Sequence, residues 1–420
     1  MCAMEQNAGN YDAIIVGAGV AGLTAARVLE DFELRALILE GEDRVGGRVK
    51  TSQREGFLLD HGFQVLLTAY PLARKYLDYE ALNLQTFASG ALCFGDKGKL
   101  KISDVQREKS AALRMLFSPA ATLMDKIRLA NLRAELVRTS PEEIFQEPEQ
   151  STLAFLRARG FSERVIKYFF RPFFSGIFLE AELQTSARFF RFVFKMFAEG
   201  GAALPAEGME AIPRQLAAGL QRSELRLQCR VESIHNGRVV LQNGEELAAP
   251  QVIVATTPDT LLPQLPQSQR WHSTEQFYFT AGQAPFRGPY VGLFSDEDSP
   301  LSNIVVLDQV ADSYAPAGHL VQVSLKSPIR GSEKEKEEQV KKALTPHFGP
   351  DVLQWQLLQR YAIERALPVV EQNSYRTDLE ECRLAPGIYL AGDQQLNPSL
   401  NGAMYSGEIA AKALIRDFQG

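Results

Sequence analysis

One stretch near the start of the chain, residues 11–51, constrains the fold more than any other. It opens with a short apolar, β-branched run that is typical of a buried parallel strand. Three glycines then follow at the spacing GxGxxG, namely Gly17, Gly19 and Gly22. Each has a steric role, since they permit a tight turn, close approach of the backbone to a pyrophosphate, and close packing of a helix on a strand.

The residues after these glycines supply the context that the motif requires. Residues 20–30 have helical spacing, so the amides of the first turn, including those of Val20 and Ala21, are expected to face the phosphates. Residues 34–39 form a second predicted strand, and Glu40 lies at its end, eighteen residues after Gly22. A carboxylate there can accept both hydroxyls of an adenosine ribose. The stretch therefore predicts a dinucleotide site rather than a glycine turn without a ligand.

A second glycine pair follows the ribose acid directly, and it is flanked by arginines that can bind phosphate oxygens. These further predicted contact residues are Gly41, Arg44, Gly46, Gly47 and Arg48. The element resembles the RxGGR motif of the superfamily of FAD-containing amine oxidases, protoporphyrinogen oxidases and carotene desaturases. The resemblance implies FAD as the resident dinucleotide. One departure is Glu42, where many relatives have a basic residue.

Length, charge and cysteine content exclude several classes. With 420 residues and 45% hydrophobic residues, the chain can fill two domain cores. A net charge of -6 argues against a general nucleic-acid binder. The four cysteines (Cys2, Cys93, Cys229 and Cys382) form no CxxC, which favours reduced thiols, no metal and a cytoplasmic or stromal-like reducing compartment. We expect neither a signal peptide nor a transmembrane helix.

A second region of resemblance lies at residues 60–71. Asp60, Gly62, Gln64 and the triplet Ala69-Tyr70-Pro71 match the order found in plant and cyanobacterial carotene desaturases, with Gln64 where those enzymes usually have histidine. The match favours the desaturase branch and implies that Asp60, His61 and Gly62 lie near the flavin. His61 is the one candidate for a polar catalytic group near the ring, with packing as the alternative role.

Residues 72–198 have a mostly helical pattern. Residues 110–137 are amphipathic and basic, which suits either a helix with one face in a core or peripheral contact with a membrane surface. Ten of the 25 phenylalanines fall between Phe169 and Phe197, interleaved with basic residues. They predict a packed helical core, with some of them lining a tunnel for an apolar substrate.

The chain then returns to the nucleotide-binding part. A glycine loop at residues 200–208 leads into a helix, and two strands, residues 226–234 and 239–241, are joined as a hairpin by His235, Asn236 and Gly237. Residues 251–257 are a further buried strand. By resemblance, Val231 would bind the adenine through its backbone, and Ala255 and Thr256 would close the nucleotide site.

Residues 261–367 predict a mixed or antiparallel sheet. The strand candidates are residues 277–281, 290–294, 303–307, 320–324 and 353–361, and only residues 334–344 are clearly helical. The predicted fold is therefore α/β, a Rossmann-like FAD-binding domain of the glutathione-reductase type with an inserted α+β substrate domain. The FAD-binding domain takes residues 1–85, 200–260 and 380–420, and the substrate domain takes residues 86–199 and 261–379.

The last stretch completes the flavin site. Residues 387–393 read as a strand that ends in an acid, and a helix opens at Gly402. The AGD and GAxxSG elements of the family are matched here. The implied cofactor contacts are Gly392, Asp393, Asn401, Gly402 and Ala403, and residues 387–420 contain no cysteine for covalent attachment, which implies noncovalent FAD.

Flavin chemistry needs few side chains, because the isoalloxazine accepts the hydride and the protein orients the substrate. Amine oxidases of the superfamily have an aromatic residue three positions before the glycine of GAxxSG, where this chain has Ser399. The sequence thus predicts hydride transfer from an apolar substrate, first a carotenoid or other polyisoprenoid. The alternatives are a protoporphyrinogen-oxidase-like or amine-oxidase-like flavoenzyme, and a non-catalytic prenyl-lipid binder similar to Rab GDP-dissociation inhibitors.

Overall fold

The computed structural model describes residues 11–95, 100–103, 121–235, 237–248, 250–258, 261 and 269–419. Its first part is a six-stranded sheet in the order β10-β2-β1-β14-β21-β20. The strands are β1 (Ala13–Val16), β2 (Ala36–Leu39), β10 (Glu224–Arg226), β14 (Val252–Val254), β20 (Arg383–Ala385) and β21 (Ile388–Leu390). The first five strands in this order are parallel, and β20 is antiparallel to β21. The sheet therefore joins strands from three distant parts of the chain.

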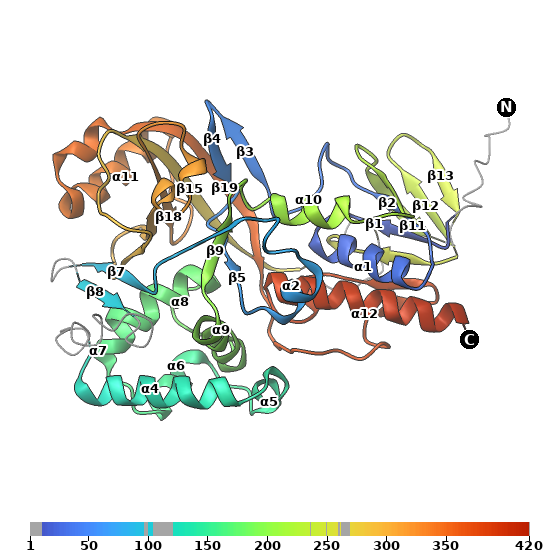
Figure 1. Cartoon of the computed structure of the whole chain (residues 1–420), viewed down its shortest axis with the longest axis horizontal. Helices are drawn as coiled ribbons and strands as arrows, with labels where there is room; N and C mark the ends of the chain where they lie inside the picture. The colour runs from blue at the N-terminus through green and yellow to red at the C-terminus, as the bar shows by residue number, and fades with distance from the viewer. Residues whose placement is uncertain are drawn as a thin grey trace.

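Two different layers cover the faces of this sheet (Figure 1). Helices α1 (Val20–Asp31), α10 (Ala211–Ala218) and α12 (Leu400–Gln419) pack on the face that carries Ile15 and Ile38. A small antiparallel sheet of β11 (Val231–His235), β12 (Arg238–Leu241) and β13 (Glu246–Ala248) packs on the face that carries Ile14 and Leu37. Because side chains alternate along a strand, the short apolar runs bury both faces.

Helices α1 and α12 lie in close contact at Gly407. A Cβ at this position would overlap the backbone carbonyl of Ala21, so only glycine permits the approach. The contact joins the first and the last segments of the chain.

The predicted strand 226–234 is wrong as a single element: residues 224–226 belong to the six-stranded sheet and residues 231–235 to the small one. The predicted hairpin after it is confirmed, with His235 opposite Arg238, although Asn236 lies outside the described residues.

The second part is a seven-stranded sheet in the order β19-β15-β18-β17-β16-β7-β8. Its strands are β7 (Gly90–Phe94), β8 (Leu100–Ser103), β15 (Trp271–Ala281), β16 (Val291–Phe294), β17 (Leu301–Val306), β18 (His319–Leu325) and β19 (Gln356–Pro368). Neighbouring strands are antiparallel except β7 and β16, which are parallel. Helix α11 (Glu333–Phe348) covers one face, which we call the outer face.

The strands predicted between residues 277 and 361 are thus confirmed, and so is the mixed sheet. The expectation of a helical pattern from residue 72 onward is corrected by β7, β8 and the short β6 (Leu84–Thr86). Strand β7 pairs with a strand some 200 residues later in the chain, from Ala91 opposite Val291 to Phe94 opposite Phe294. Such distant pairing leaves no local sequence signal.

Most helices of residues 71–199 form the lower left part of Figure 1, while α2 lies beside α12. The helices of this segment are α2 (Pro71–Tyr76), α4 (Leu123–Arg138), α5 (Pro141–Gln146), α6 (Thr152–Ala158), α7 (Glu163–Val165), the π-helix η1 (Ile166–Phe170), α8 (Arg171–Phe178) and α9 (Ala187–Glu199). All ten phenylalanines of the aromatic segment lie in the main hydrophobic core or pack against it, which confirms the predicted core. Phe174 and Phe190, for example, meet edge to face at 4.6 Å between ring centroids.

Short elements connect the two sheets. The hairpin β3 (Thr51–Arg54) and β4 (Phe57–Asp60) stands between them in Figure 1, and β5 (Leu66–Leu67) and β6 pair with β9 (Ala202–Pro205). Single 3-10 turns are η3 (Leu307–Gln309), η4 (Asp312–Tyr314), η5 (Pro350–Gln354) and η6 (Asp393–Gln395). Within the described ranges, no helix has the length and apolar character needed to cross a membrane.

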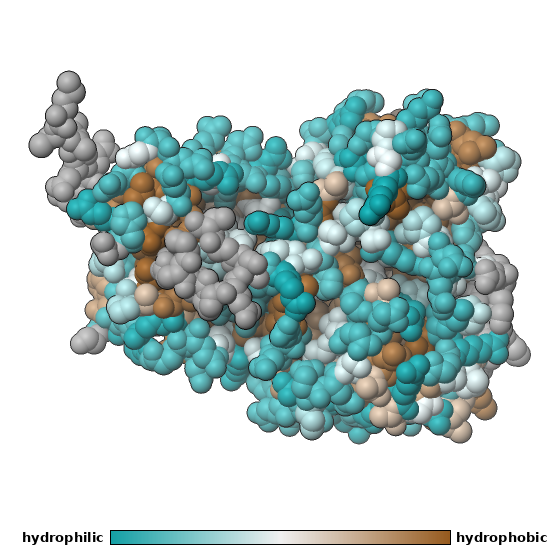
Figure 2. Space-filling model, turned by 180° about the vertical axis from the view of Figure 1, so that it is seen from behind, coloured by the Kyte–Doolittle hydropathy of each residue, from teal (hydrophilic) through white to brown (hydrophobic). Residues whose placement is uncertain are grey.

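Helix α4 is the described part of the amphipathic stretch, since residues 110–120 and the N-terminal residues with Cys2 lie outside the described ranges. Three large apolar side chains near its start are exposed: Leu123, Met124 and Ile127. In Figure 2, apolar atoms gather at the lower right, over the helices that Figure 1 shows at the lower left. Peripheral membrane contact through this helix stays a prediction.

Candidate functional site

The carboxyl ends of four parallel strands meet at one edge of the six-stranded sheet. Gly17 follows β1, Glu40 follows β2, Ala255 follows β14 and Ala391 follows β21. Backbone hydrogen bonds continue the ladder past the strand ends, from Ala255 N to Val16 O at 2.8 Å and from Ala391 N to Val254 O at 2.9 Å. Ligands of open parallel sheets bind at such edges. Residues predicted from three distant parts of the sequence are therefore brought together.

The three glycines of the first motif have distinct environments. Gly17 has φ +106°, and a Cβ there would lie 2.9 Å from the carbonyl oxygen of Ala255. At Gly22, a Cβ would overlap Gly17 O, so this glycine permits close packing of α1 on β1. At Gly19, by contrast, a Cβ would meet nothing within 4 Å. The space beside Gly19 is open, at the end of a helix whose first amides have no side-chain cap.

Glu40 lies beside this open space. One carboxylate oxygen accepts a hydrogen bond from Ala18 N at 2.8 Å, and the other accepts one from Glu42 N at 3.0 Å. These two bonds hold the carboxylate at the end of β2, next to the glycine loop. Glu42, the departure from the family pattern, forms an ion pair with Lys50.

The segment before Val231 runs alongside Glu40. Cys229 N donates to Glu40 O at 2.8 Å, and Gln228 N donates to Glu42 O at 2.8 Å. The Arg230 side chain covers Gly41, where a Cβ would lie 3.2 Å from the guanidinium carbon. Arg230 is thus a candidate adenosine contact that the sequence did not reveal, because nothing in its local pattern distinguishes it from a surface arginine.

The second glycine pair contacts the first motif. Gly46 N donates to Ala18 O at 2.9 Å, and a Cβ on Gly47 would lie 3.4 Å from Gly19 Cα. Both glycines of the pair have positive φ, +121° and +59°. Two glycine loops that touch across an open space form a cradle that side chains would fill.

Arg48 extends from this cradle to the other sheet. Its guanidinium pairs with the buried carboxylate of Asp393, lies 5.2 Å from the ring centroid of Trp271, and is 3.5 Å from Ala366 O. Asp393 follows Gly392, which has φ +147° and donates its amide to Ser406 Oγ at 2.8 Å. Trp271 is a second residue that the sequence did not single out, since it starts a strand in the other sheet.

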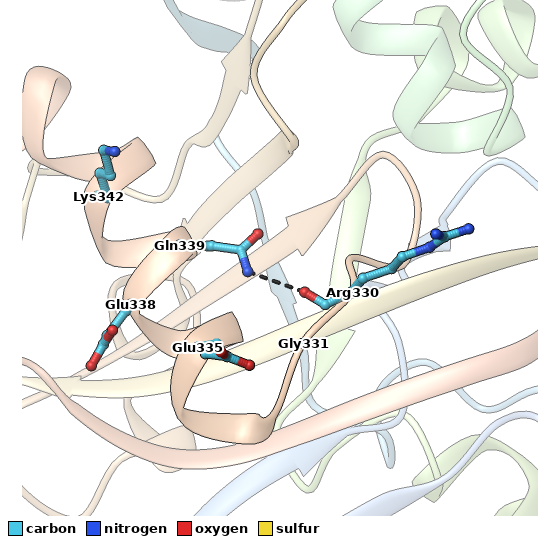
Figure 3. A pocket seen from close by; sticks show the side chains of 6 residues that line it. All are labelled: Arg330, Gly331, Glu335, Glu338, Gln339 and Lys342. Carbon is cyan, nitrogen blue, oxygen red and sulfur yellow. Dashed lines mark hydrogen bonds between the residues drawn. The ribbon is translucent and has the colours of Figure 1, made fainter.

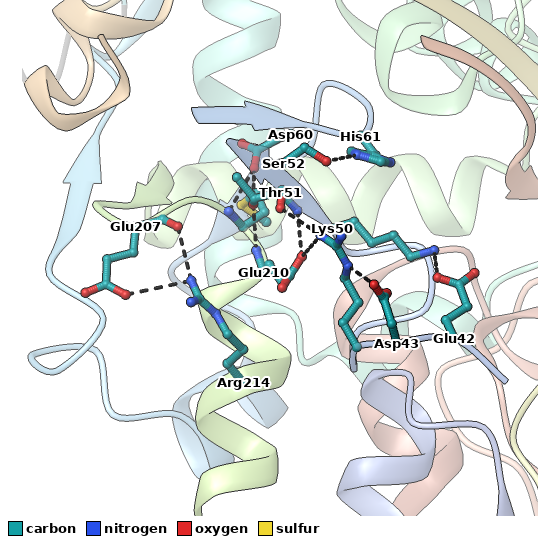
Figure 4. Close-up of polar contacts among 12 residues, drawn as sticks. Glu42, Asp43, Lys50, Thr51, Ser52, Asp60, His61, Glu207, Glu210 and Arg214 are labelled. Carbon is teal, nitrogen blue, oxygen red and sulfur yellow. Dashed lines mark hydrogen bonds and ion pairs between the residues drawn. The ribbon is translucent and has the colours of Figure 1, made fainter. Parts of the chain in front are cut away.

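Asp60 (Figure 4) and Arg44 both have protein partners. The Arg44 guanidinium faces Glu210 at 3.5 Å and Thr51 O at 3.4 Å rather than the cradle. The Asp60 carboxylate is buried and accepts bonds from Thr51 Oγ1 at 2.6 Å, Met209 N at 2.9 Å and Tyr314 Oη at 2.8 Å. Both side chains thus connect the hairpin to α10 and to the second sheet, and their direct cofactor contacts stay predictions.

His61 also has protein partners. Its Nε2 lies 2.8 Å from Ser52 Oγ, and its ring stacks on Tyr361 of β19 with 4.2 Å between centroids. Burial lowers the pKa of His61, and the nearby charges of Lys50 and Arg44 lower it further, so the imidazole is neutral at pH 7. Gly62 follows with φ +112°. The structure supports the packing role of His61.

The start of α12 corrects another expectation. The helix begins at Leu400 rather than Gly402, because Ser399 caps it. Gly402 N donates to Ser399 Oγ at 2.9 Å and Ala403 N donates to Ser399 O at 2.9 Å, so neither amide is free for the flavin. Asn401 accepts a bond from Leu72 N at 3.1 Å, while its buried Nδ2 has no partner among the described residues.

A shallow pocket on α11 is a separate feature (Figure 3). Its lining residues are Arg330, Gly331, Glu335, Glu338, Gln339 and Lys342. Gln339 Nε2 donates to Arg330 O at 3.1 Å and ties the helix to the preceding loop. The lining is charged and open to solvent, and it lies on the outer side of the seven-stranded sheet, away from the strand edge.

Comparisons with known proteins agree with this geometry. The profile of the family "Flavin containing amine oxidoreductase" matches residues 20–415. A coproporphyrinogen III oxidase from Propionibacterium freudenreichii subsp. freudenreichii is 29% identical over 171 residues, which is 39% of this chain and 31% of that protein. Matches to the curated relatives span only 11–31% of their own length.

Solved structures are similar over nearly the whole chain. A crystal structure assigned provisionally as a protoporphyrinogen oxidase, from Exiguobacterium sp. 255-15, has a TM-score of 0.72 at 21% identity and covers 96% of this chain and 98% of its own. A putrescine oxidase with bound putrescine has a TM-score of 0.68 at 16% identity and covers 97% and 99%. At these identities, the likeness shows a shared fold.

Proposed function

The chain belongs to the flavin-containing amine oxidoreductase family, and we propose that it is an FAD-dependent oxidoreductase that oxidises a porphyrinogen-like substrate at a carbon. Bound FAD supplies the hydride acceptor. The protein residues supply binding, orientation and exclusion of water. This proposal replaces the polyisoprenoid substrate that the sequence favoured, because the relatives support the porphyrinogen alternative better.

The strand edge fits FAD. The open space at Gly19 admits a pyrophosphate against the amides of α1, and Glu40 lies where an adenosine ribose would need an acceptor. Arg48 and the buried Asp393 lie on the far side of the touching glycine loops, toward the second sheet. We propose that they hold the flavin end. Noncovalent binding is part of the proposal, since residues 387–420 contain no cysteine.

We also propose the finer fold and domain assignment. A parallel sheet with helices on one face and a small antiparallel sheet on the other supports a Rossmann-like FAD-binding domain of the glutathione-reductase type. The strands of the six-stranded sheet lie within residues 1–85, 200–260 and 380–420 of the proposed division. Those of the seven-stranded sheet lie within residues 86–199 and 261–379.

One observation carries the choice against an amine substrate. Amine oxidases resemble one another in an aromatic residue at the position of Ser399. The Ser399 hydroxyl caps α12 by accepting a hydrogen bond from Gly402 N, and it donates one to Asn397 Oδ1 at 2.6 Å. A capping serine leaves no aromatic wall over the flavin at this point. Most phenylalanines of the aromatic segment are buried in the core, which weakens the main support for a long hydrocarbon tunnel.

Anaerobic mixing tests the substrate class. We expect the absorption of oxidised flavin to bleach with coproporphyrinogen III and to persist with putrescine. A hydrocarbon polyene is the third probe, since bleaching by the polyene alone would restore the desaturase hypothesis. Bleaching by the amine alone would contradict the proposal.

Replacing Glu40 by alanine tests the adenosine end. The variant loses charged hydrogen bonds to the ribose, each contributing about 1.5 to 3 kcal/mol, so FAD should dissociate at least about tenfold more readily. Equilibrium dialysis of apoprotein against FAD measures the change. Glu42→Ala, two residues away and paired with Lys50, is the matched control. Equal FAD affinity of Glu40→Ala and wild type would contradict the assignment.

A further inference from the structure

The two faces of the seven-stranded sheet differ in chemistry. The outer face packs on α11 through apolar side chains such as Phe277, Phe279, Val321 and Val323. The opposite face, which we call the inner face, carries alternate residues of the same strands. The register places Tyr361, Gln276, Ser324 and Asn303 opposite one another across four neighbouring strands. A polar row therefore crosses the inner face.

This polar row is buried. Gln276, Gln322, Asn303 and Ser324 are each 3% exposed or less. Gln322 lies beside the row, opposite Tyr278 on β15, and its Nε2 donates to Gln276 Oε1 at 2.5 Å. Ser324 Oγ donates to Asn303 Oδ1 at 2.9 Å. The four side chains are thus connected in two pairs.

Each amide keeps one end without a hydrogen-bond partner in the part of the chain that the structure describes. These ends are Gln276 Nε2, Asn303 Nδ2 and Gln322 Oε1. None of these three ends is among the fully buried side-chain atoms without a partner, so each reaches accessible space on the inner face, where a ligand group can bind it. Two donors and one acceptor in a row match a ligand that both accepts and donates hydrogen bonds.

The row begins next to the proposed flavin end. Tyr361 stacks on His61, and the loop after His61 returns to Arg48 through a bond from Gln64 Nε2 to Arg48 O at 2.9 Å. At its other end, the row reaches α8, where a Cβ on Gly176 would lie 3.4 Å from Asn303 Nδ2. A substrate held along the row would therefore extend from the flavin end toward α8.

Resting on the proposed function, we infer that Gln276, Gln322 and Asn303 are specificity-determining residues that hydrogen-bond polar groups of the substrate. Pyrrole N–H groups can donate to Gln322 Oε1, and carboxylate oxygens can accept from the two amide NH2 groups. A pure hydrocarbon would leave all three groups unpaired. A site built to hydrogen-bond its ligand rejects an analogue that lacks the polar groups.

The double variant Gln276→Met/Gln322→Met tests the inference. It removes both members of a bonded pair at similar side-chain volume, so the fold and the FAD content should stay close to wild type. We expect about tenfold weaker binding of coproporphyrin III in equilibrium dialysis. The KM for coproporphyrinogen III should rise by the same factor with kcat unchanged, and binding of a hydrocarbon polyene should not weaken.

Gln339→Met, the same replacement at the exposed face of α11, is the control. Asn303→Leu/Ser324→Ala removes the second pair and keeps the test open if the first double variant does not fold. Equal porphyrin affinity of the wild type and the folded double variant overturns the inference and leaves the proposed function intact. Porphyrin binding that depends on the row, without any flavin bleaching by porphyrinogen, overturns the proposed function and keeps the inference. A wild-type protein that binds no porphyrin overturns both.

Discussion

A Gly19→Val variant is expected to fold like the wild type and to purify without FAD. Gly19 has φ -74° and ψ 176°, a conformation that any residue adopts, and a Cβ there meets no atom within 4 Å. The valine side chain would instead fill the space that the pyrophosphate needs. The FAD released per protein after heating, together with the midpoint of thermal unfolding of the apoprotein, measures both parts of this prediction.

Gly22→Val is the matched control. Its Cβ would overlap Gly17 O and lie 3.1 Å from Ala255 Cβ, so this variant should lose stability even without cofactor. The two variants therefore distinguish a glycine that leaves space for a ligand from a glycine that is needed for the packing of α1 on β1. A yellow, normally loaded Gly19→Val variant would contradict the position of the pyrophosphate.

Replacing Asp60 should affect stability more than any other single change in the connecting hairpin. Asp60→Leu removes the acceptor of three hydrogen bonds, from Thr51, Met209 and Tyr314, and leaves buried donors unpaired. We expect a loss of about 3 kcal/mol in the free energy of unfolding. Asp60→Asn keeps the oxygen that binds Thr51 and Met209, and its amide can donate to Tyr314. Urea unfolding of both variants measures the difference.

The difference in unfolding free energy between the wild type and Asp60→Asn should change with pH in one direction. Burial raises the pKa of Asp60 above its ordinary value of 3.8. A raised pKa means that the folded protein favours the protonated form of Asp60. The stability that protonated Asp60 contributes is therefore complete below pH 3.8 and declines as pH rises through the folded pKa. The wild type should therefore lose stability relative to Asp60→Asn between about pH 4 and the folded pKa. A wild type that gains on the variant as pH rises would contradict the effect of burial.

The strand edge was predictable because its signals are local. Gly17, Gly19, Gly22 and Glu40 lie within one β-α-β unit; contacts inside the protein require glycine at positions 17 and 22, and Gly19 leaves open space for a ligand. Strands β15 to β19 of the second sheet were also predicted from apolar runs between turn residues. Strands β7 and β8 were not, since the pairing of β7 with β16 depends on contacts between residues far apart in the chain.

The roles of Asp60 and Gly402 could not be predicted for a different reason. Asp60 resembles a cofactor residue in sequence, but its partner Tyr314 lies 254 positions away. The Gly402 amide matches a family motif, yet Ser399 starts the helix two residues earlier and takes this donor. In both cases a hydrogen bond inside the protein competes with the ligand, and only three-dimensional structure shows which partner is in reach.

The visible absorption spectrum of the purified protein, recorded before and after incubation with FAD, is the most direct test of the central claim. The strand edge, the open glycine cradle and Glu40 predict the absorption band of oxidised flavin, in proportion to protein, either at once or after reconstitution. The band should be absent from Gly19→Val treated in the same way. A folded wild-type protein that stays colourless in both measurements would contradict FAD binding at this site.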